Sequence, residues 1–182
     1  MELTDGVVTL RPPTEGDVLD VARAVRESLA ALQPWMPWAT SDYDATVART
    51  WVKESREREE HPFLVLDASG TLVGSCGLNH VDVLNRVANL GYWLRTGHTG
   101  RGHATRATRL TARFGHETAG LHRLEIYASV RNLASCRVAE RAGARFEGVL
   151  RGRLLLQGAH HDARMYSLVP GDLDGAGDGG AP

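Results

Sequence analysis

Short apolar runs and helical periodicities alternate along the chain, and this alternation predicts an α/β fold. Leu124, Ile126 and Ala128 are apolar at every second position, which indicates a strand with one buried face. Together the patterns predict one mixed sheet of about seven strands with about four helices, in this order: a strand at 7–10, helices from 14 and from 41, strands at 63–66, 71–78 and 87–94, a helix at 102–119, a strand at 124–130, a helix at 132–143, and strands at 145–157 and 160–168.

Polar residues and glycines mark where these helices begin and end. Thr14 followed by Asp17 resembles a capping box, and Ser41 with Asp42 precedes the apolar face of the second helix. Gly120 follows the longest helical stripe, where a glycine commonly ends a helix.

Length and composition then limit the class of protein. The chain has 182 residues, 42% of them hydrophobic and 24% charged, with a formal net charge of −1, which excludes general disorder. Its two cysteines, Cys76 and Cys136, are too few for a disulfide scaffold and lack a metal-ligand spacing. Neither a signal peptide nor an apolar span of membrane length is found, so we expect a cytoplasmic protein with no membrane partner.

The glycines are unevenly distributed. Five of the 20 lie in the last twelve residues, beside three aspartates and a single leucine, so residues 170–182 are predicted to be a flexible tail. The folded domain then spans residues 1–169. Without the three tail aspartates, 21 basic residues face 19 acidic ones.

The remaining informative glycines, Gly97, Gly100 and Gly102, lie between a predicted strand and a predicted helix. Such glycines let backbone N–H groups approach an anion, which the helix dipole also favours. The segment 95–116 contains three histidines, no acidic residue and five arginines, at positions 95, 101, 106, 109 and 113. This charge bias indicates a polyphosphorylated ligand.

Four interpretations of this loop can be compared. A Walker-type loop requires Lys and then Ser or Thr after Gly102, where His103 and Ala104 stand. A dinucleotide fingerprint requires a glycine-like residue where Thr105 stands. The pyrophosphate loop of an acyl-CoA enzyme, or a simple connecting turn, fits the residues present.

An ordered set of motifs resembles the GNAT superfamily of N-acetyltransferases, in its RimJ/RimL branch. The motifs run from Leu32 to Gly148 and the resemblance covers about residues 5–168; in order they are LQPWMPW (32–38), LGYWL (90–94), GRGHAT (100–105), NLAS (132–135), ERAG (140–143) and EG (147–148). The resemblance implies a single GNAT-type domain whose strands are mostly antiparallel and splay in the middle, between 87–94 and 123–130.

The resemblance also implies how acetyl-CoA binds. The pantetheine arm would lie in the splay and pair with the backbone of Tyr92, Trp93 and Leu94. Asn132 would bond the pantetheine or cysteamine portion. The amides of the glycine loop would hold the pyrophosphate, and the residues concerned are Gly100, Arg101, Gly102, His103, Ala104 and Thr105.

Several positions depart from the family pattern. The superfamily often has a catalytic tyrosine where Ala139 stands, and RimL-like proteins use a serine that corresponds to Ser135 as the proton donor to the thiolate. The acidic base of RimL corresponds to a position near Leu154, so that base is absent. Three further positions depart from the family pattern. Thr99 stands where the family usually has Gln or Arg, Arg106 where it often has Glu, and Ala144 where it often has an aromatic residue.

Acetyl transfer requires a neutral amine, a stabilised thioester oxygen and a proton for the thiolate. A backbone N–H at Trp93 or Leu94 can donate a hydrogen bond to the thioester oxygen. For the base, Glu147, His80 and Asp82 are candidates, as is a water chain.

Structural interpretations of the candidate residues remain open. Ser135 can bond its own helix, Asn132 can be only an N-cap, and His80 and Glu147 can be structural. Trp35, Met36 and Trp38 either pack the N-terminal helices or wall the acceptor pocket. The loop arginines can be solvated.

The leading hypothesis is an acetyl-CoA-dependent, metal-free N-acetyltransferase that uses direct attack in a ternary complex. The resemblance implies a protein N-terminal α-amine as acceptor, as on a ribosomal protein, and a homodimer. The alternatives are acetylation of a small amine such as an antibiotic or polyamine, or a non-catalytic CoA-binding regulatory module. Direct nucleic-acid binding is not expected, because no aromatic stacking run accompanies the basic helix.

Overall fold

The computed structural model describes residues 1–57 and 60–174 and contains one eight-stranded sheet. The sheet order is β1-β2-β3-β4-β5-β6-β8-β7, and among the strands of the described residues β5–β6 is the only parallel pair. The strands are β1 Leu3–Thr4, β2 Val8–Arg11, β3 His61–Asp67, β4 Leu72–Asp82, β5 Val87–Leu94, β6 Arg123–Ser129, β7 Arg145–Leu156 and β8 Ala159–Leu168. The predicted fold class is confirmed. The sheet gains the two-residue strand β1, which is too short to give a periodic signal.

Five α-helices accompany the sheet in the described residues, one more than predicted. They are α1 Val18–Glu27, α2 Leu29–Leu32, α3 Ala45–Glu57, α4 His103–Glu117 and α5 Leu133–Ala142, with short 3-10 helices η1 at Glu15–Asp17 and η2 at Thr96–His98. The capping box of Thr14 and Asp17 is confirmed, although it opens η1 and not α1 directly. The predicted start of α3 at Ser41 and Asp42 is wrong, because Asp44 Oδ1 accepts the N–H groups of Thr46 and Val47 at 2.7 and 3.0 Å.

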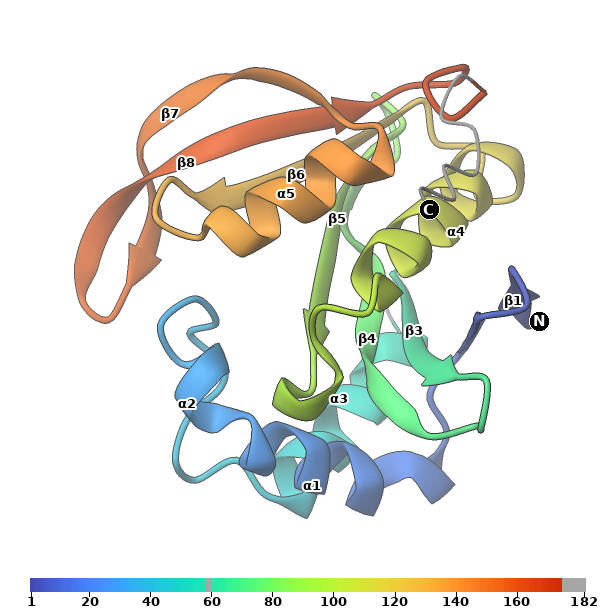
Figure 1. Cartoon of the computed structure of the whole chain (residues 1–182), viewed down its shortest axis with the longest axis vertical. Coiled ribbons are helices and arrows are strands. Elements are labelled where there is room, and N and C mark those ends of the chain that lie inside the picture. The colour runs from blue at the N-terminus through green and yellow to red at the C-terminus, as the bar shows by residue number, and fades with distance from the viewer. Residues whose placement is uncertain (58–59, 175–182) are drawn as a thin grey trace.

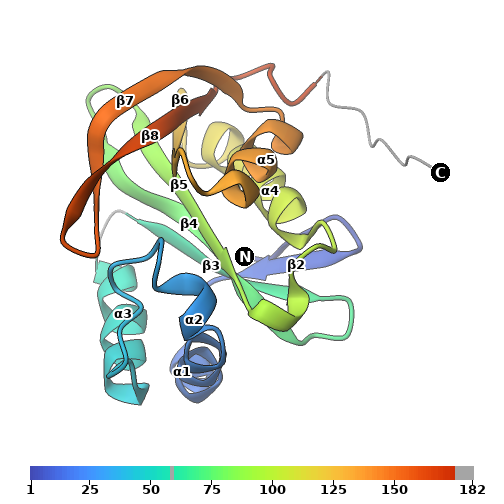
Figure 2. The same ribbon diagram turned by 60° about the vertical axis from the view of Figure 1, so that its left-hand side comes forward.

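The helices cover the two faces of the sheet separately (Figures 1 and 2). One hydrophobic core lies between the sheet and the helices α4 and α5, and includes Leu90, Leu124 and Tyr166. The second core lies between α1, α2 and α3 and the opposite face, where it receives Leu64 and Leu72. Because side chains alternate along a strand, neighbouring residues of β5 contribute to different cores.

The sheet splays between β5 and β6, as the family resemblance implied. The two strands pair only at Val87–Asn89 with Arg123–Glu125. Beyond Asn89, β5 continues to Leu94 against β4, while β6 continues to Ser129 against β8. The sheet therefore opens into two arms, and the facing edges of β5 and β6 are unpaired there.

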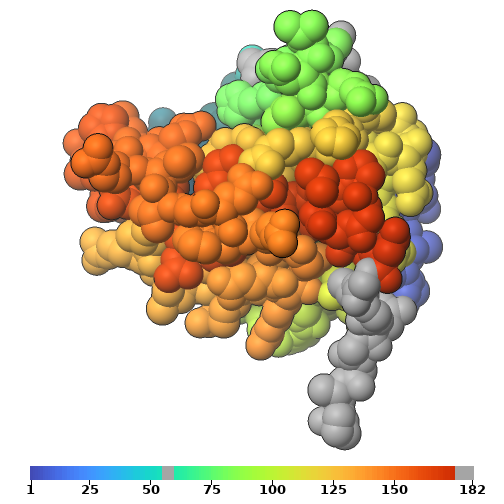
Figure 3. Space-filling view, turned by 90° about the horizontal axis from the view of Figure 1, so that it is seen from above, coloured from blue at the N-terminus to red at the C-terminus, as the bar shows by residue number. Residues whose placement is uncertain are grey.

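The fold extends past the predicted end of the domain. Leu173 is buried in the first core, and Asp172 Oδ2 accepts the N–H of Val169 at 2.8 Å, so residues 170–174 belong to the folded unit. The rest of the predicted tail, 175–182, lies outside the described residues. At the end of the molecule seen in Figure 3, β7 and β8 cover much of the surface. Within the described ranges, no helix is long and apolar enough to cross a membrane.

Candidate active site

A cavity of about 530 Å³ lies at the opening of the sheet. Its walls come from β4, β5 and β6, the first turn of α5, the end of β7, and the chain between α2 and the middle of α3. The cavity therefore borders the splayed edges of the strands and the helices on both faces of the sheet. A ligand inserted between the strands would meet a second ligand in this cavity.

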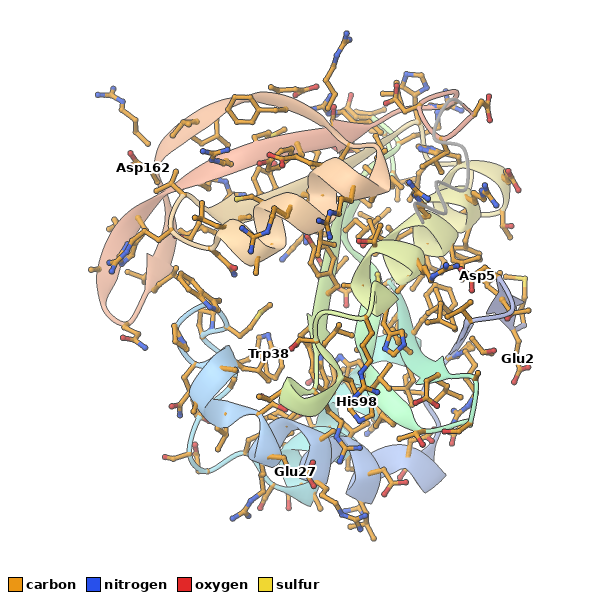
Figure 4. All side chains as sticks on the ribbon, in the orientation of Figure 1. Glu2, Asp5, Glu27, Trp38, His98 and Asp162 are labelled. Atoms are coloured by element: carbon orange, nitrogen blue, oxygen red, sulfur yellow. The ribbon has the colours of Figure 1, made fainter. Side chains whose placement is uncertain are left out.

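One wall of the cavity is aromatic. Trp38 lies between α2 and β5 (Figure 4), with its ring centroid 6.0 Å from Trp93 and 5.8 Å from Tyr43. Trp35 and Met36 line the same cavity. The 32–38 loop therefore lines the cavity, and Met36 also packs against the second core, so the two interpretations of this loop are compatible.

The opposite side of the cavity is polar. Asn89 Nδ2 donates to Asn79 Oδ1 at 2.7 Å, and His80 follows Asn79 with a φ of +50°. This left-handed conformation is uncommon outside glycine and is more frequent for His, Asn and Asp. His80 is exposed and lines the cavity, so one of the predicted bases lies at the site.

Ser135 is held at the cavity wall from two directions. Asn132 Oδ1 accepts the N–H of Ser135 at 3.1 Å, so Asn132 is the N-cap of α5. The hydroxyl of Tyr92 donates to the carbonyl of Ser135 at 2.9 Å and lies 3.1 Å from Ser135 Oγ. Burial raises the pKa of Tyr92, so the phenol stays protonated. The hydroxyl of Ser135 therefore meets a side chain from the other arm of the sheet.

The glycine loop has the geometry of an anion cradle. Gly100 and Gly102 have φ values of +77° and +80°, and a Cβ at either position would meet nothing within 4 Å. The N–H of Arg106 donates to the carbonyl of Gly102, which begins α4 and leaves the preceding N–H groups without intrahelical acceptors. Open space, a helix N-terminus and free N–H groups fit the pyrophosphate of a CoA ester.

The arginines near this loop have different roles. Arg106 pairs with Asp5 at 2.8 Å, and Arg109 donates to the carbonyl of Arg141 at 2.8 Å, so both hold neighbouring elements together. Arg101 remains exposed at the loop and donates to the carbonyl of Gly97 at 3.2 Å. The charge pattern of the sequence does not predict the contacts of Arg106 and Arg109, because their partners are far away in the sequence.

The prediction of Glu147 as a base is contradicted by its surroundings. Its carboxylate binds both terminal nitrogens of Arg123, at 2.8 and 2.5 Å, and accepts from Ser167 Oγ at 2.6 Å. The hydrogen bond from Arg123 above all lowers the pKa of Glu147 to about 2. Glu147 does not line the cavity. Asp82 also lies outside it, bound to Asn85 in the turn between β4 and β5.

Two candidate functional residues, Tyr127 and Glu125, were not predicted from the sequence. Tyr127 lines the cavity and its hydroxyl donates to Glu125 Oε2, while the guanidinium of Arg153 lies 4.6 Å from the ring centroid. The alternation along β6 places Glu125 and Tyr127 on the face opposite the buried one. That signal was available, but only the splay shows that this face borders a cavity.

Comparison with known proteins agrees with this geometry. The family described as acetyltransferase (GNAT) domain matches residues 8–145. The protein YdaF of Bacillus subtilis (strain 168) is 30% identical over 172 residues, covering 92% of this chain and 94% of that one. The ribosomal-protein-serine acetyltransferase of Escherichia coli (strain K12) is 32% identical over 98 residues, covering 54% and 55%.

A solved structure gives the same result in three dimensions. Mycobacterium smegmatis RimJ in complex with CoA-disulfide has a TM-score of 0.83 at 28% identity, covering 95% of this chain and 88% of that one. The fold, the ordered motifs and these matches confirm the RimJ/RimL resemblance. The chain is an N-acetyltransferase and belongs to the GNAT family.

Proposed function

We propose that this protein transfers an acetyl group from acetyl-CoA to the N-terminal α-amine of a protein, by direct attack in a ternary complex. The observation that carries the proposal is the opening between β5 and β6, which connects the glycine loop to an aromatic-walled cavity. The binding of CoA-disulfide by RimJ supports the choice of acetyl-CoA.

The cosubstrate is held by backbone groups and one amide side chain. The N–H groups of Gly100, Arg101, Gly102, His103, Ala104 and Thr105 bind the pyrophosphate. The unpaired edge of β5, at Tyr92, Trp93 and Leu94, pairs with the pantetheine arm. Asn132 bonds the pantetheine or cysteamine portion, a role compatible with its N-cap bond to Ser135.

The acetyl-CoA thioester supplies the acyl group, and residues around the cavity stabilise its transfer. The N–H of Trp93 or Leu94 donates to the thioester oxygen as negative charge develops there. Ser135 gives a proton to the departing thiolate. His80 is retained as a candidate base because it lines the cavity.

The acceptor is assigned from the relatives and from the cavity. The acceptor of the E. coli relative is a ribosomal protein. Among the described residues that line the cavity, Glu60 is the only acid, whereas a polyamine or aminoglycoside requires several. A protein N-terminus carries one positive charge and fits this wall better. Such acceptors are found in the cytoplasm.

The test begins with calorimetry of acetyl-CoA binding, followed by release of CoA thiol with a panel of N-terminal peptides, polyamines and aminoglycosides. We expect acetyl-CoA to bind and peptides to be acetylated fastest. Faster turnover of a polyamine or aminoglycoside would overturn the acceptor assignment. Binding without turnover on any amine would favour a CoA-binding regulatory module. The homodimer stays a prediction, checked by sedimentation.

A further inference from the structure

Tyr127 faces the opening of the sheet on its acceptor side. Asn89 pairs with Glu125, so Gly91 and Tyr127 lie two residues further along their strands on the same face, across the opening from each other. Gly91 has no side chain, and a Cβ there would meet Asn89 Nδ2 at 3.6 Å and Asn79 Nδ2 at 3.8 Å. The absence of that Cβ leaves room for a reacting group beside Tyr127.

The hydroxyl of Tyr127 is already committed as a donor. Its single proton is directed to Glu125 Oε2, while Oε1 of the same carboxylate accepts from Arg123 Nε at 2.8 Å. The Tyr127 oxygen also interacts with Arg153, and its remaining lone-pair capacity can accept an incoming N–H. Burial first, and then the hydrogen bond to Glu125, raise the pKa of Tyr127, so this arrangement persists at neutral pH.

We infer that Tyr127, backed by Glu125, takes the proton from the attacking amine. This inference rests on the proposed function and names the base that it left open. Glu147 is bound by Arg123 outside the cavity. The family resemblance places the acidic base of RimL near Leu154, which has no carboxyl group. His80 lies at the cavity without a carboxylate behind it among the described residues, whereas Tyr127 has one.

The relay moves one proton from the attacking amine through Tyr127 to Glu125. The amine enters neutral after losing its ammonium proton to water, and its lone pair forms the C–N bond as the C=O π electrons move to oxygen. The nitrogen then gives one proton to Tyr127 Oη, and the Tyr127 proton moves to Glu125 Oε2. The C–S bond breaks and the thiolate is protonated by Ser135. Solvent restores the proton of Ser135, and Glu125 gives the proton that it received to solvent.

The charged groups facing Tyr127 are Glu125 from its own strand and Arg153 from β7. Arg123 and Glu147 complete the network around Glu125.

Two variants with matched controls test the inference. Tyr127→Phe removes the hydroxyl and keeps the ring. Its control is Tyr166→Phe, on the neighbouring strand β8 and outside the cavity, which removes a hydroxyl that donates to Glu140 at 2.9 Å. Glu125→Gln keeps a hydrogen-bond acceptor that cannot take the proton. Glu140→Gln makes the same change in the carboxylate that accepts from Tyr166, outside the cavity.

The assay uses the full chain and the amine that wild type acetylates fastest. We expect Tyr127→Phe and Glu125→Gln each to lower kcat by about 100-fold, with acetyl-CoA affinity within about twofold. We expect the kcat of wild type to rise with pH, and both variants to show a flatter profile. The two controls should keep kcat and its pH profile, and melting curves confirm folding.

Three outcomes separate this inference from the proposed function. Wild type without acetyl-CoA binding or without turnover contradicts the proposed function and the inference together. An active wild type with Tyr127→Phe and Glu125→Gln within about threefold of it contradicts only the inference. The inference is also wrong if His80→Asn flattens the pH profile while Tyr127→Phe preserves it.

Discussion

At the scale of single residues, Ser135 illustrates how two arms of one sheet meet at a side chain. Asn132 fixes its N–H and the Tyr92 hydroxyl fixes its carbonyl, so its Oγ is positioned by bonds from its own helix and from β5. A hydroxyl held in this way needs little reorganisation to reach a thiolate.

The Ser135→Ala variant tests its role as the proton donor. Because the thiolate would then leave without a proton from the protein, we expect kcat to fall by about 100-fold, with acetyl-CoA affinity within about twofold. Ser69→Ala, in the turn between β3 and β4, is the control and should retain full activity. Unchanged kcat for Ser135→Ala across the pH range would exclude the donor role.

A second residue-scale prediction concerns Asp17, which connects β2 to α1. Its carboxylate accepts from both terminal nitrogens of Arg11, at 2.8 and 2.6 Å, and from the N–H of Thr14 at 2.7 Å. The bonds from Arg11 above all lower its pKa to about 2. A lowered carboxyl pKa stabilises the fold above the unfolded value, near 3.9, and this stabilisation is lost as pH falls through about 2.

We therefore expect Asp17→Asn to lower the free energy of unfolding by about 1–2 kcal/mol at pH 7 and by much less at pH 2.5. Urea unfolding at both pH values measures the difference. Asp20→Asn, in an exposed pair with Arg23 at 3.5 Å, should cost about 0.5 kcal/mol or less. An equal cost of Asp17→Asn at the two pH values would contradict the linkage.

At the scale of elements, the turn from β5 into α4 depends on two left-handed glycines. An alanine at Gly102, whose φ is +80°, costs about 1–2 kcal/mol in that conformation. The loop can relieve this strain by turning its N–H groups away from the ligand. We expect Gly102→Ala to raise the acetyl-CoA Kd about tenfold by calorimetry.

Gly70→Ala is the matched control for this strain. Gly70 has a φ of +78° in the turn between β3 and β4, and a Cβ there also meets nothing within 4 Å. It should lose similar stability without any change in acetyl-CoA Kd. Equal Kd values for the two variants would mean that the loop does not bind the ligand.

The elements also show what the sequence predicts and what it does not. The alternation of Val87–Leu94 gives the bounds of β5 because every second residue, from Ala88 and Leu90 to the partly buried Tyr92 and Leu94, packs against the same core. The cap at Asp44 was missed because Ser41, Asp42 and Asp44 are equivalent in propensity, and only the path of the chain selects one. Glu147 was misassigned because its partners, Arg123 and Ser167, lie 24 and 20 positions away.

At the scale of the whole molecule, two halves meet across the opening through few direct bonds. In the described residues these bonds include the three residue pairs of β5 with β6, the bonds from Tyr92 to Ser135, the bond from Arg109 to the carbonyl of Arg141, and a contact of 3.4 Å from Gln157 Nε2 to the carbonyl of Gln33. A ligand that pairs with β5 and reaches α5 spans this opening. Its binding energy therefore adds to the stability of the whole fold.

Acetyl-CoA should accordingly raise the melting temperature. At 100 times Kd, binding to the native state alone contributes about 2.7 kcal/mol, which corresponds to about 5–10 °C for a chain of this size. Thermal unfolding with acetyl-CoA, and with an acetylated thiol that lacks the nucleotide as control, measures the effect. An equal rise with both compounds would place the binding energy in the cavity alone and contradict a role for the glycine loop. A rise that only acetyl-CoA produces means that the nucleotide end of the ligand contributes to binding.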